Sequence, residues 1–217
     1  MSVSGAPRLF QRATELVEER FQELIIPLFF QVDLAIKSKR GMPYPYLQVA
    51  LRLAREFDFK NIVEIGSMRQ PMDHDFEAIN PLCCNEGHST LFFASSGAEV
   101  FTADVNPHCA EVLLPATRKF RNLHVYTADG IWFLKQFERP IDLLYLDAWD
   151  VVTGTDYAKK HLDAYRVALP HLAPTCMVLI DDTDIANGGK GRLVIPQMIR
   201  DGFDLVTWGR QAMLVRG

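Results

Sequence analysis

The sequence predicts an α/β protein with a doubly wound, mostly parallel seven-stranded sheet, a C-terminal antiparallel hairpin and an N-terminal helical cap. From about residue 45 onwards, short apolar segments alternate with helical patterns, which is typical of a parallel sheet with helices on both faces. The last two apolar segments are joined only by Gly209-Arg210, which indicates a hairpin. Before the first strand, apolar residues recur at helical spacing from residue 9 to about residue 39.

The predicted strands are short apolar runs that end at glycine, proline or acidic residues. They cover residues 61–65, 99–104, 123–128, 141–146, 176–180, 203–208 and 211–216. The helices predicted between them cover residues 46–57, 87–95, 107–120, 131–137, 157–172 and 193–201.

The composition is that of one soluble globular domain, with 217 residues, 48% hydrophobic and 23% charged. A net charge of −4 and a pI near 5.9 argue against a nucleic-acid partner, which needs a basic face. No apolar run approaches ~20 residues, and residues 1–12 lack the apolar core of a signal peptide. We therefore expect no contact with membranes and a cytoplasmic location. The four cysteines have no metal-ligand spacing, so reduced thiols are expected.

Residues 1–42 are predicted to form the helical cap, and residues 43–217 the domain that contains the sheet. Pro27 is expected to break or kink the cap into two helices. Their apolar faces are expected to pack onto the sheet or between subunits, which would give a homo-oligomer. A substrate lid is the alternative.

The segment around Glu64-Ile65-Gly66 is predicted to form a ligand-binding turn. Gly66 ends the first strand, and a helix begins within Gly87-His88-Ser89-Thr90. Strand, glycine turn and helix N-terminus together let backbone N–H groups converge on a nucleotide-like ligand. The intervening residues 67–86 form a segment of a length that is often functional. Within it, His74 and its two aspartate neighbours are either a metal or proton-transfer cluster or part of a polar surface loop.

Carboxylates follow four of the predicted parallel strands, at the edge where such sheets bind their ligands. Asp104 has the spacing from Glu64 that places a carboxylate on ribose hydroxyls, once the long intervening segment is discounted. Asp129, followed by Gly130, lies where an adenine amine would need an acceptor. Helix N-capping explains one or two of these aspartates but not the full set. The set is Asp104, Asp129, Asp147 and the pair Asp181-Asp182.

The carboxylates of Asp147, Asp181 and Asp182 are expected to lie together, because they follow two neighbouring strands. Three clustered carboxylates repel one another unless they are protonated or bound to a cation. Hard oxygen ligands suit Mg²⁺, Mn²⁺ or Ca²⁺. The alternative is a mixture of helix caps and cofactor contacts.

The order of these motifs resembles the class I S-adenosylmethionine-dependent methyltransferases, which have a Rossmann-like sheet. It is most similar to their metal-dependent O-methyltransferases of the catechol and macrolide-sugar types, and the resemblance covers about residues 45–217. The motifs are Val63-Glu64-Ile65-Gly66, Gly87-His88-Ser89-Thr90, Asp104, Asp129-Gly130, Leu146-Asp147 and Ile180-Asp181-Asp182.

The resemblance implies that S-adenosylmethionine is the cofactor and assigns a role to each motif. The ribose would be held by Asp104, the adenine would lie beside Asp129 and Gly130, and Asp147 would lie at the cofactor as well as the metal. Residues lining the methionine end would be Glu64, Gly66 and Ser67. Further cofactor-binding candidates are Gly87, Ser89 and His88, which is either a residue of the first helical turn or a contact of the cofactor's carboxylate. Mg²⁺ or another divalent cation on Asp147, Asp181 and Asp182 would bind the acceptor hydroxyl and lower its pKa.

Three features of the chain depart from that pattern or lie outside it. The segment 67–86 is an insertion between two glycines that are usually about five residues apart in the family. At Asp150, catechol-type enzymes carry a lysine base and their relatives carry histidine. Asp150 is either the base or a loop cap; His161, His74 or no residue are the alternatives. Residues 187–191 include Gly-Gly-Lys-Gly without a Walker pattern, and we expect a mobile acceptor lid there.

The expected function is O-methyl transfer, assisted by a divalent metal, to a hydroxyl of a small molecule such as a sugar or a secondary metabolite. The catalytic candidates are Asp147 and Asp150. One alternative is a catalytically silent protein of the same fold that binds cofactor or a partner. Another is a nicotinamide-dependent oxidoreductase, against which the absence of a compact Gly-x-Gly-x-x-Gly counts. Methylation of nucleic acid is not expected, because the charge is unsuitable and no Asn/Asp-Pro-Pro-Tyr motif is present.

Overall fold

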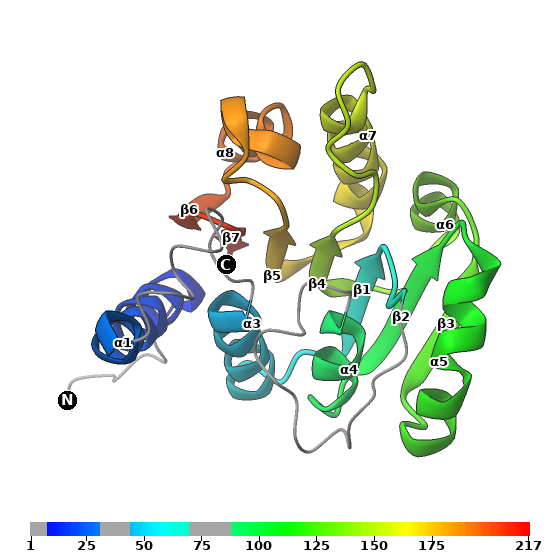
Figure 1. The fold of residues 1–217 in the computed structure, drawn as a ribbon, viewed down its shortest axis with the longest axis horizontal. Helices are drawn as coiled ribbons and strands as arrows, with labels where there is room; N and C mark the ends of the chain where they lie inside the picture. Colours follow the sequence, from blue (N-terminus) through cyan, green and yellow to red (C-terminus); the bar gives the residue numbers. More distant parts are fainter. Residues whose placement is uncertain (1–7, 31–43, 70–87) are drawn as a thin grey trace.

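The computed structural model describes residues 8–30, 44–69 and 88–217. Its strands are β1 Asn61–Ile65, β2 Glu99–Asp104, β3 Leu123–Thr127, β4 Ile141–Leu146, β5 Leu172–Ile180, β6 Asp204–Trp208 and β7 Ala212–Arg216. They form a single seven-stranded sheet in the order β3-β2-β1-β4-β5-β7-β6 (Figure 1). Strands β1 to β5 pair in parallel, and β7 runs antiparallel to both β5 and β6. The predicted α/β sheet with a closing hairpin is confirmed.

Helices cover both faces of this sheet. One face carries α1 Leu9–Phe30, α3 Tyr44–Glu56, α4 Ser89–Ala94 and α5 Pro107–Lys119. The other face carries α6 Gly130–Gln136, α7 Tyr157–Ala168 and α8 Val194–Arg200, and two short 3-10 segments are η3 Leu169–His171 and η4 Ala186–Gly191. Among the described helices, none combines the length and the hydrophobicity that a membrane-spanning helix needs.

Alternate residues of each central strand enter two separate hydrophobic cores, because successive side chains of a strand point to opposite faces. On β4, Leu143 and Tyr145 lie in the core beneath α3 and α4, while Leu144 and Leu146 lie in the core beneath α7. All four side chains are buried. Burial of this kind stabilises the fold by roughly 1.5–3 kcal/mol per large apolar side chain. The sheet therefore forms a rigid base whose carboxyl edge carries the polar residues.

Helix α1 packs against α3 and the β6–β7 edge of the sheet, as the blue helix of Figure 1 shows. Its buried side chains, Leu9, Ala13 and Leu16, follow helical spacing and belong to the same core as α3. The guanidinium of Arg12 also contacts the Glu56 carboxylate at 2.7 Å. The packing of the cap onto the rest of the molecule is thus observed along these residues.

Pro27 lies inside α1 and does not end it. The predicted break at this residue is therefore wrong, while the alternative that we named, a kink, stays a prediction. A proline removes one backbone hydrogen bond and crowds the preceding turn, but α1 has only three residues beyond Pro27 in which to lose regularity. The remainder of the predicted cap, residues 31–42, lies outside the described residues.

Candidate functional site

The carboxyl ends of β1, β2, β4 and β5 meet at one edge of the sheet, since these strands are parallel and adjacent. Each is followed by residues that the sequence analysis selected. The backbone ties these ends together: the Gly66 amide donates to the carbonyl of Ala103 at 2.9 Å, and the Asp147 amide donates to that of Ile65 at 2.8 Å. The strand-end residues are thereby brought together as predicted.

Gly66 lies where the backbone leaves β1 and closely approaches the end of β4. Its φ is +97°, a conformation that residues with a Cβ rarely adopt. A Cβ at this position would lie 2.7 Å from both the carbonyl carbon and the carbonyl oxygen of Asp147, and 2.9 Å from the amide nitrogen of Ala148. These contacts are all backbone, so no rotamer change relieves them. Only glycine fits this turn without strain.

Glu64 is fully buried and connects β1 to the start of α4. Ser89 Oγ donates to its Oε1 at 2.6 Å, and Thr90 Oγ1 donates to its Oε2 at 2.5 Å. Burial raises the pKa of Glu64 to about 7, against the opposing effect of these hydrogen bonds. Ser89, Thr90 and the neighbouring His88 are also buried. In this structure Glu64 and Ser89 hold the turn together, and their assignment to the methionine end stays a prediction.

Asp104 is held in place by backbone amides from two loops. Its Oδ2 accepts from the Ser67 amide at 3.0 Å, and its Oδ1 accepts from the Asn106 amide at 2.8 Å. The Ser67 hydroxyl forms a 2.6 Å hydrogen bond with that of Thr102, which fixes the loop after β1. The carboxylate is partly exposed at the sheet edge. This geometry presents an acceptor to a ligand lying beside Gly66.

Asp129 caps α6, since its Oδ1 accepts from the amide of Trp132 at 2.9 Å. Gly130 is buried against β1, where an added Cβ would clash with the side chain of Ile65. The close approach explains why glycine follows the aspartate. Trp132, whose amide this cap holds, has a 60% exposed side chain.

Asp147, Asp181 and Asp182 converge as predicted: one carboxylate oxygen from each lies within 4.8 Å of the other two. At this cluster, however, the structure places an ammonium group. Lys190 Nζ lies 2.8 Å from Asp147 Oδ1, 3.2 Å from the Asp147 carbonyl oxygen and 3.2 Å from Asp182 Oδ2. The lysine side chain is 0% exposed. Burial lowers the pKa of Lys190, but Asp147 and Asp182 raise it by more, so the side chain stays charged.

A second cation, Arg210, lies on the other side of the cluster, at the turn between β6 and β7. Its Nη2 contacts Asp181 Oδ2 at 3.0 Å, and its Nη1 contacts Asp182 Oδ1 at 2.7 Å. Gln211 Nε2 donates to Asp181 Oδ1 at 2.9 Å. Burial and Asp147 raise the pKa of Asp181 well above its ordinary value, against the effect of Arg210. Two cations and a proton can together balance the three carboxylates.

The residues present do not fit a divalent metal at this position. The ammonium of Lys190 already lies between Asp147 and Asp182, and the guanidinium of Arg210 bridges Asp181 and Asp182. A bound ion would have to displace at least one of these cations from a buried position. The predicted carboxylate cluster is therefore correct, while the Mg²⁺ expected on it is at odds with the side chains that fill it.

The candidate bases lie in different surroundings. Asp150 is exposed and forms a two-pronged ion pair with Arg69, at 3.1 Å and 3.3 Å. His161 is fully buried; its Nδ1 lies 2.7 Å from the carbonyl oxygen of Tyr157, and its ring packs edge-on against Trp149. Burial and Lys190 lower the pKa of His161 to about 4, so the ring is neutral near pH 7. His74 and Gly87 lie outside the described residues.

The predicted lid, residues 187–191, overlaps η4 and packs against the end of β5. The amide of Lys190 donates to the carbonyl of Asp182 at 3.2 Å. A Cβ on Gly189 would clash with that same carbonyl oxygen. The structure thus shows a compact turn that carries the buried side chain of Lys190. The predicted mobile lid, an open loop over the acceptor, is not what these residues form. The signal in the sequence was a lone lysine between glycines, eight residues after a pair of aspartates.

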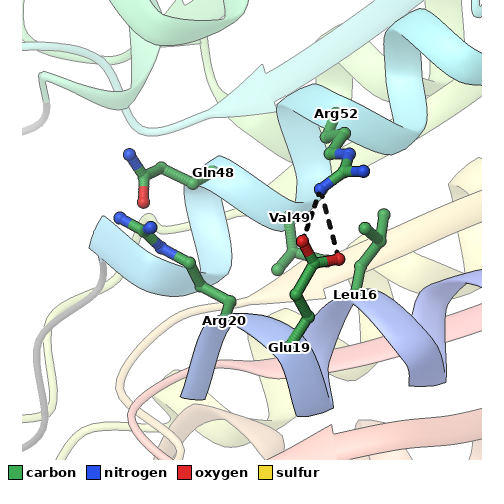
Figure 2. Close-up of a pocket in the computed structure, with 6 residues that line it drawn as sticks. All are labelled: Leu16, Glu19, Arg20, Gln48, Val49 and Arg52. Carbon is green, nitrogen blue, oxygen red and sulfur yellow. Dashed lines mark hydrogen bonds and ion pairs between the residues drawn. The ribbon is translucent and has the colours of Figure 1, made fainter. Parts of the chain in front are cut away.

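A separate cavity of about 210 Å³ lies between α1 and α3, as Figure 2 shows. Arg52 Nη1 reaches across it to both carboxylate oxygens of Glu19, at 3.4 Å each. None of the described residues that line it belongs to the candidate site. Those residues are Leu16, Glu19, Arg20, Gln48, Val49 and Arg52.

Comparison with known proteins gives structural matches only. No protein-family model matches the chain, and a search of curated proteins finds no match. Among solved structures, a candidate caffeoyl-CoA O-methyltransferase from Staphylococcus aureus aligns with a TM-score of 0.59 at 16% identity, covering 90% of this chain and 98% of that one. A methyltransferase from Podospora anserina bound to S-adenosylhomocysteine aligns with a TM-score of 0.56 at 16% identity, covering 99% and 90%.

A third match has a known place in biosynthesis. The O-methyltransferase of tomaymycin synthesis from Streptomyces achromogenes, in complex with S-adenosylmethionine, aligns with a TM-score of 0.54 at 14% identity, covering 98% of this chain and 92% of that one. This chain has the fold of the S-adenosylmethionine-dependent methyltransferases. The fold that the sequence resemblance implied is thereby confirmed over nearly the whole chain. At these identities, the likeness concerns the fold alone.

Proposed function

We propose that this chain is an S-adenosylmethionine-dependent O-methyltransferase that acts on a hydroxyl group of a small molecule, such as a sugar or a secondary metabolite. The observation that carries the proposal is the carboxylate of Asp104, which the amides of Ser67 and Asn106 hold at the sheet edge beside the Gly66 turn. A ribose has two adjacent hydroxyls that need such an acceptor. Methyltransferases of the same fold include proteins solved with S-adenosylmethionine or S-adenosylhomocysteine.

Bound S-adenosylmethionine would supply a methyl group on a positively charged sulfur. It would donate this methyl group to the acceptor oxygen and leave as S-adenosylhomocysteine with the electron pair on sulfur, while the hydroxyl proton would pass to a base of this chain. The residues of this chain contribute binding and orientation. Gly66 keeps the turn clear of side chains, Asp104 would accept hydrogen bonds from the ribose, and Asp129 would lie beside the adenine. Positioning of this kind supplies much of the rate in a bimolecular transfer.

Asp150 is the proposed base for the hydroxyl proton. It is exposed, lies three residues beyond Asp147, and forms a two-pronged ion pair with Arg69. Asp147, with its partly exposed side chain at the end of β4, is proposed to lie between the cofactor and the acceptor. Metal assistance, which the sequence analysis expected, is not part of this proposal, because the carboxylates that would hold the ion are engaged by Lys190 and Arg210.

The proposal is tested by titrating the purified chain with S-adenosylhomocysteine in a calorimeter. We expect binding at micromolar strength, and we expect Asp104→Asn to weaken it by about 10- to 100-fold, because a hydrogen bond to a charged group contributes about 1.5–3 kcal/mol. Asp163→Asn is the matched control, since Asp163 pairs with Lys159 on α7 and belongs to no part of the site. The control should bind as the wild type does.

Two further measurements separate this function from its alternatives. Transfer of a labelled methyl group from S-adenosylmethionine to sugars, phenols and aliphatic alcohols tests the catalytic part, and binding without transfer to any of them would favour a silent cofactor-binding protein. Titration with NADH tests the oxidoreductase alternative. Failure to bind S-adenosylhomocysteine would contradict the proposal altogether.

A further inference from the structure

Lys190 satisfies every hydrogen of its ammonium group within the carboxylate cluster. An ammonium group has three donors and no acceptor. The three acceptors are Asp147 Oδ1 at 2.8 Å, the Asp147 carbonyl oxygen at 3.2 Å and Asp182 Oδ2 at 3.2 Å. A lysine is almost never fully buried unless it is paired. This one is paired with two carboxylates and one carbonyl oxygen.

The backbone around Lys190 is shaped to bring it there. Asp182 and Asn187 have φ angles of 52° and 62°, a region where aspartate and asparagine are more frequent than most residues. Gly188 and Gly189 continue the turn with φ angles of 84° and 48°. A Cβ on Gly189 would clash with the carbonyl of Asp182, which itself accepts from the Lys190 amide. The turn therefore returns Lys190 to the end of β5.

All six carboxylate oxygens of the cluster face a donor. Lys190 engages Asp147 Oδ1 and Asp182 Oδ2, and Arg210 engages Asp181 Oδ2 and Asp182 Oδ1. Gln211 Nε2 donates to Asp181 Oδ1 at 2.9 Å. The last oxygen, Asp147 Oδ2, lies 3.4 Å from the hydroxyl of Tyr145. Mg²⁺ needs oxygen ligands at about 2.0–2.1 Å in near-octahedral geometry. An ion at these oxygens would lie within a few ångströms of the ammonium, where like charges repel strongly.

We propose that the ammonium of Lys190 takes the place of a divalent cation in this site, so that methyl transfer by this chain needs no metal. The proposal rests on the proposed function for its catalytic part and on the geometry of the cluster for its metal part. Lys190 is a positioning residue: it holds the ends of β4 and β5 together through Asp147 and Asp182.

The replacement has a consequence for the acceptor. A metal ion can bind two adjacent oxygens of a substrate at once and thereby select vicinal diols. The ammonium of Lys190 is buried and its three hydrogens are already accepted, so it has no free donor for a substrate. Lys190 itself therefore offers no donor to a second oxygen of the acceptor.

The metal part is tested with Mn²⁺, whose free-ion electron paramagnetic resonance signal falls when the ion binds. After the purified chain has been dialysed against EDTA, titration with Mn²⁺ should give the same signal for the wild type and for Asp182→Asn. Asparagine suits the positive φ at this position, so the variant removes a ligand without adding backbone strain. Lys190→Met should gain Mn²⁺ binding by at least tenfold over the wild type. Lys159→Met, on the surface of α7, is the matched control and should show no gain.

The outcomes separate this proposal from the proposed function. Mn²⁺ binding by the wild type at micromolar strength, lost in Asp182→Asn, would overturn the replacement of the metal. This comparison does not involve Lys190→Met, so it holds even if that variant does not fold. S-adenosylhomocysteine binding and labelled-methyl transfer should be unchanged within twofold between EDTA and Mg²⁺, and transfer that EDTA abolishes would also overturn the replacement. A chain that binds no S-adenosylhomocysteine in either condition would contradict the proposed function and leave the Mn²⁺ result valid.

Discussion

Among single residues, the candidate site depends on two glycines at positions where any larger residue would clash. Gly66 turns at the end of β1 against the backbone of Asp147, and Gly130 begins α6 against Ile65. Both glycines bring backbone close to backbone or to a core side chain at the ligand-facing edge. The positions of the polar groups at this edge thus depend on the missing Cβ atoms of these two glycines as well as on hydrogen bonds.

Gly66→Ala should weaken both folding and cofactor binding. The added Cβ would lie 2.7 Å from the Asp147 carbonyl, and the φ of +97° adds strain. We expect a loss of about 1–3 kcal/mol in the free energy of unfolding and at least a tenfold loss of S-adenosylhomocysteine affinity. Urea denaturation and calorimetry measure the two effects.

Gly97→Ala separates the two causes. Gly97 has a nearly identical φ of +93°, but a Cβ there would have no atom within 4 Å. This control should lose about 1–2 kcal/mol from the backbone conformation alone and keep its affinity. An equal loss of affinity in both variants would show that the approach to Asp147 is unimportant.

Glu64 makes the stability of the protein depend on pH. Its pKa is raised from its ordinary 4.5 to about 7 in the folded protein. Between these values the folded chain keeps a proton on Glu64 that the unfolded chain has released, so the free energy of unfolding falls as the pH rises through this window. Below the window both states are protonated, and the effect is absent.

Glu64→Gln removes this titration and keeps an amide that hydrogen-bonds with Ser89 and Thr90. Urea denaturation across the window should show the wild type losing on the order of 1–3 kcal/mol relative to the variant. Glu138→Gln, at an exposed side chain, controls for the loss of one negative charge. A constant difference between wild type and Glu64→Gln at every pH would show that the pKa of Glu64 is ordinary.

At the scale of elements, α1 behaves as part of the core more than as a detachable cap. Leu16 is 2% exposed and shares its core with α3 and the sheet, and Figure 2 shows it among the residues that line the cavity between the two helices. The division of the chain at residue 42 was a sequence-based prediction and stays one. The contacts of α1 show that its described part packs against α3, β6 and β7, which belong to residues 43–217.

Leu16→Ala should therefore destabilise the whole molecule. Removing a buried leucine typically costs about 2–5 kcal/mol, and urea denaturation should show the loss as one cooperative transition. Phe10→Ala is the comparison on the same helix, because Phe10 is 40% exposed; it should change stability by about 0.5 kcal/mol or less. Equal effects of the two substitutions would mean that α1 contributes little to the core.

At the scale of the whole molecule, the sheet was predictable because its signals are local. Each strand is a short apolar run with a polar boundary, as in residues 141–146 before Asp147, and alternation with helices implies a parallel sheet. The parallel arrangement then places the strand-end carboxylates at one edge without any knowledge of side-chain positions. The same local signals misled at Pro27, because the helix continues past this residue to Phe30.

The partners of the carboxylates could not be predicted, because they come from distant irregular segments. Lys190 follows a turn with no period, and Arg210 lies in a hairpin whose sequence specifies only a reversal of the chain. Three clustered carboxylates need either protonation or a nearby cation, and from the sequence alone a metal and a lysine are equally suitable as that cation. Only the path of the backbone through Gly189 decides between them.

The buried charges also limit how this sequence can change over generations. Loss of either Lys190 or Arg210 alone leaves a carboxylate without its counterion, and breaking such a buried pair typically costs about 3–5 kcal/mol. That is a large share of the roughly 5–15 kcal/mol by which a domain is usually stable. We therefore expect substitutions here to survive mainly as compensating pairs, with the lysine, the arginine and their aspartates inherited together.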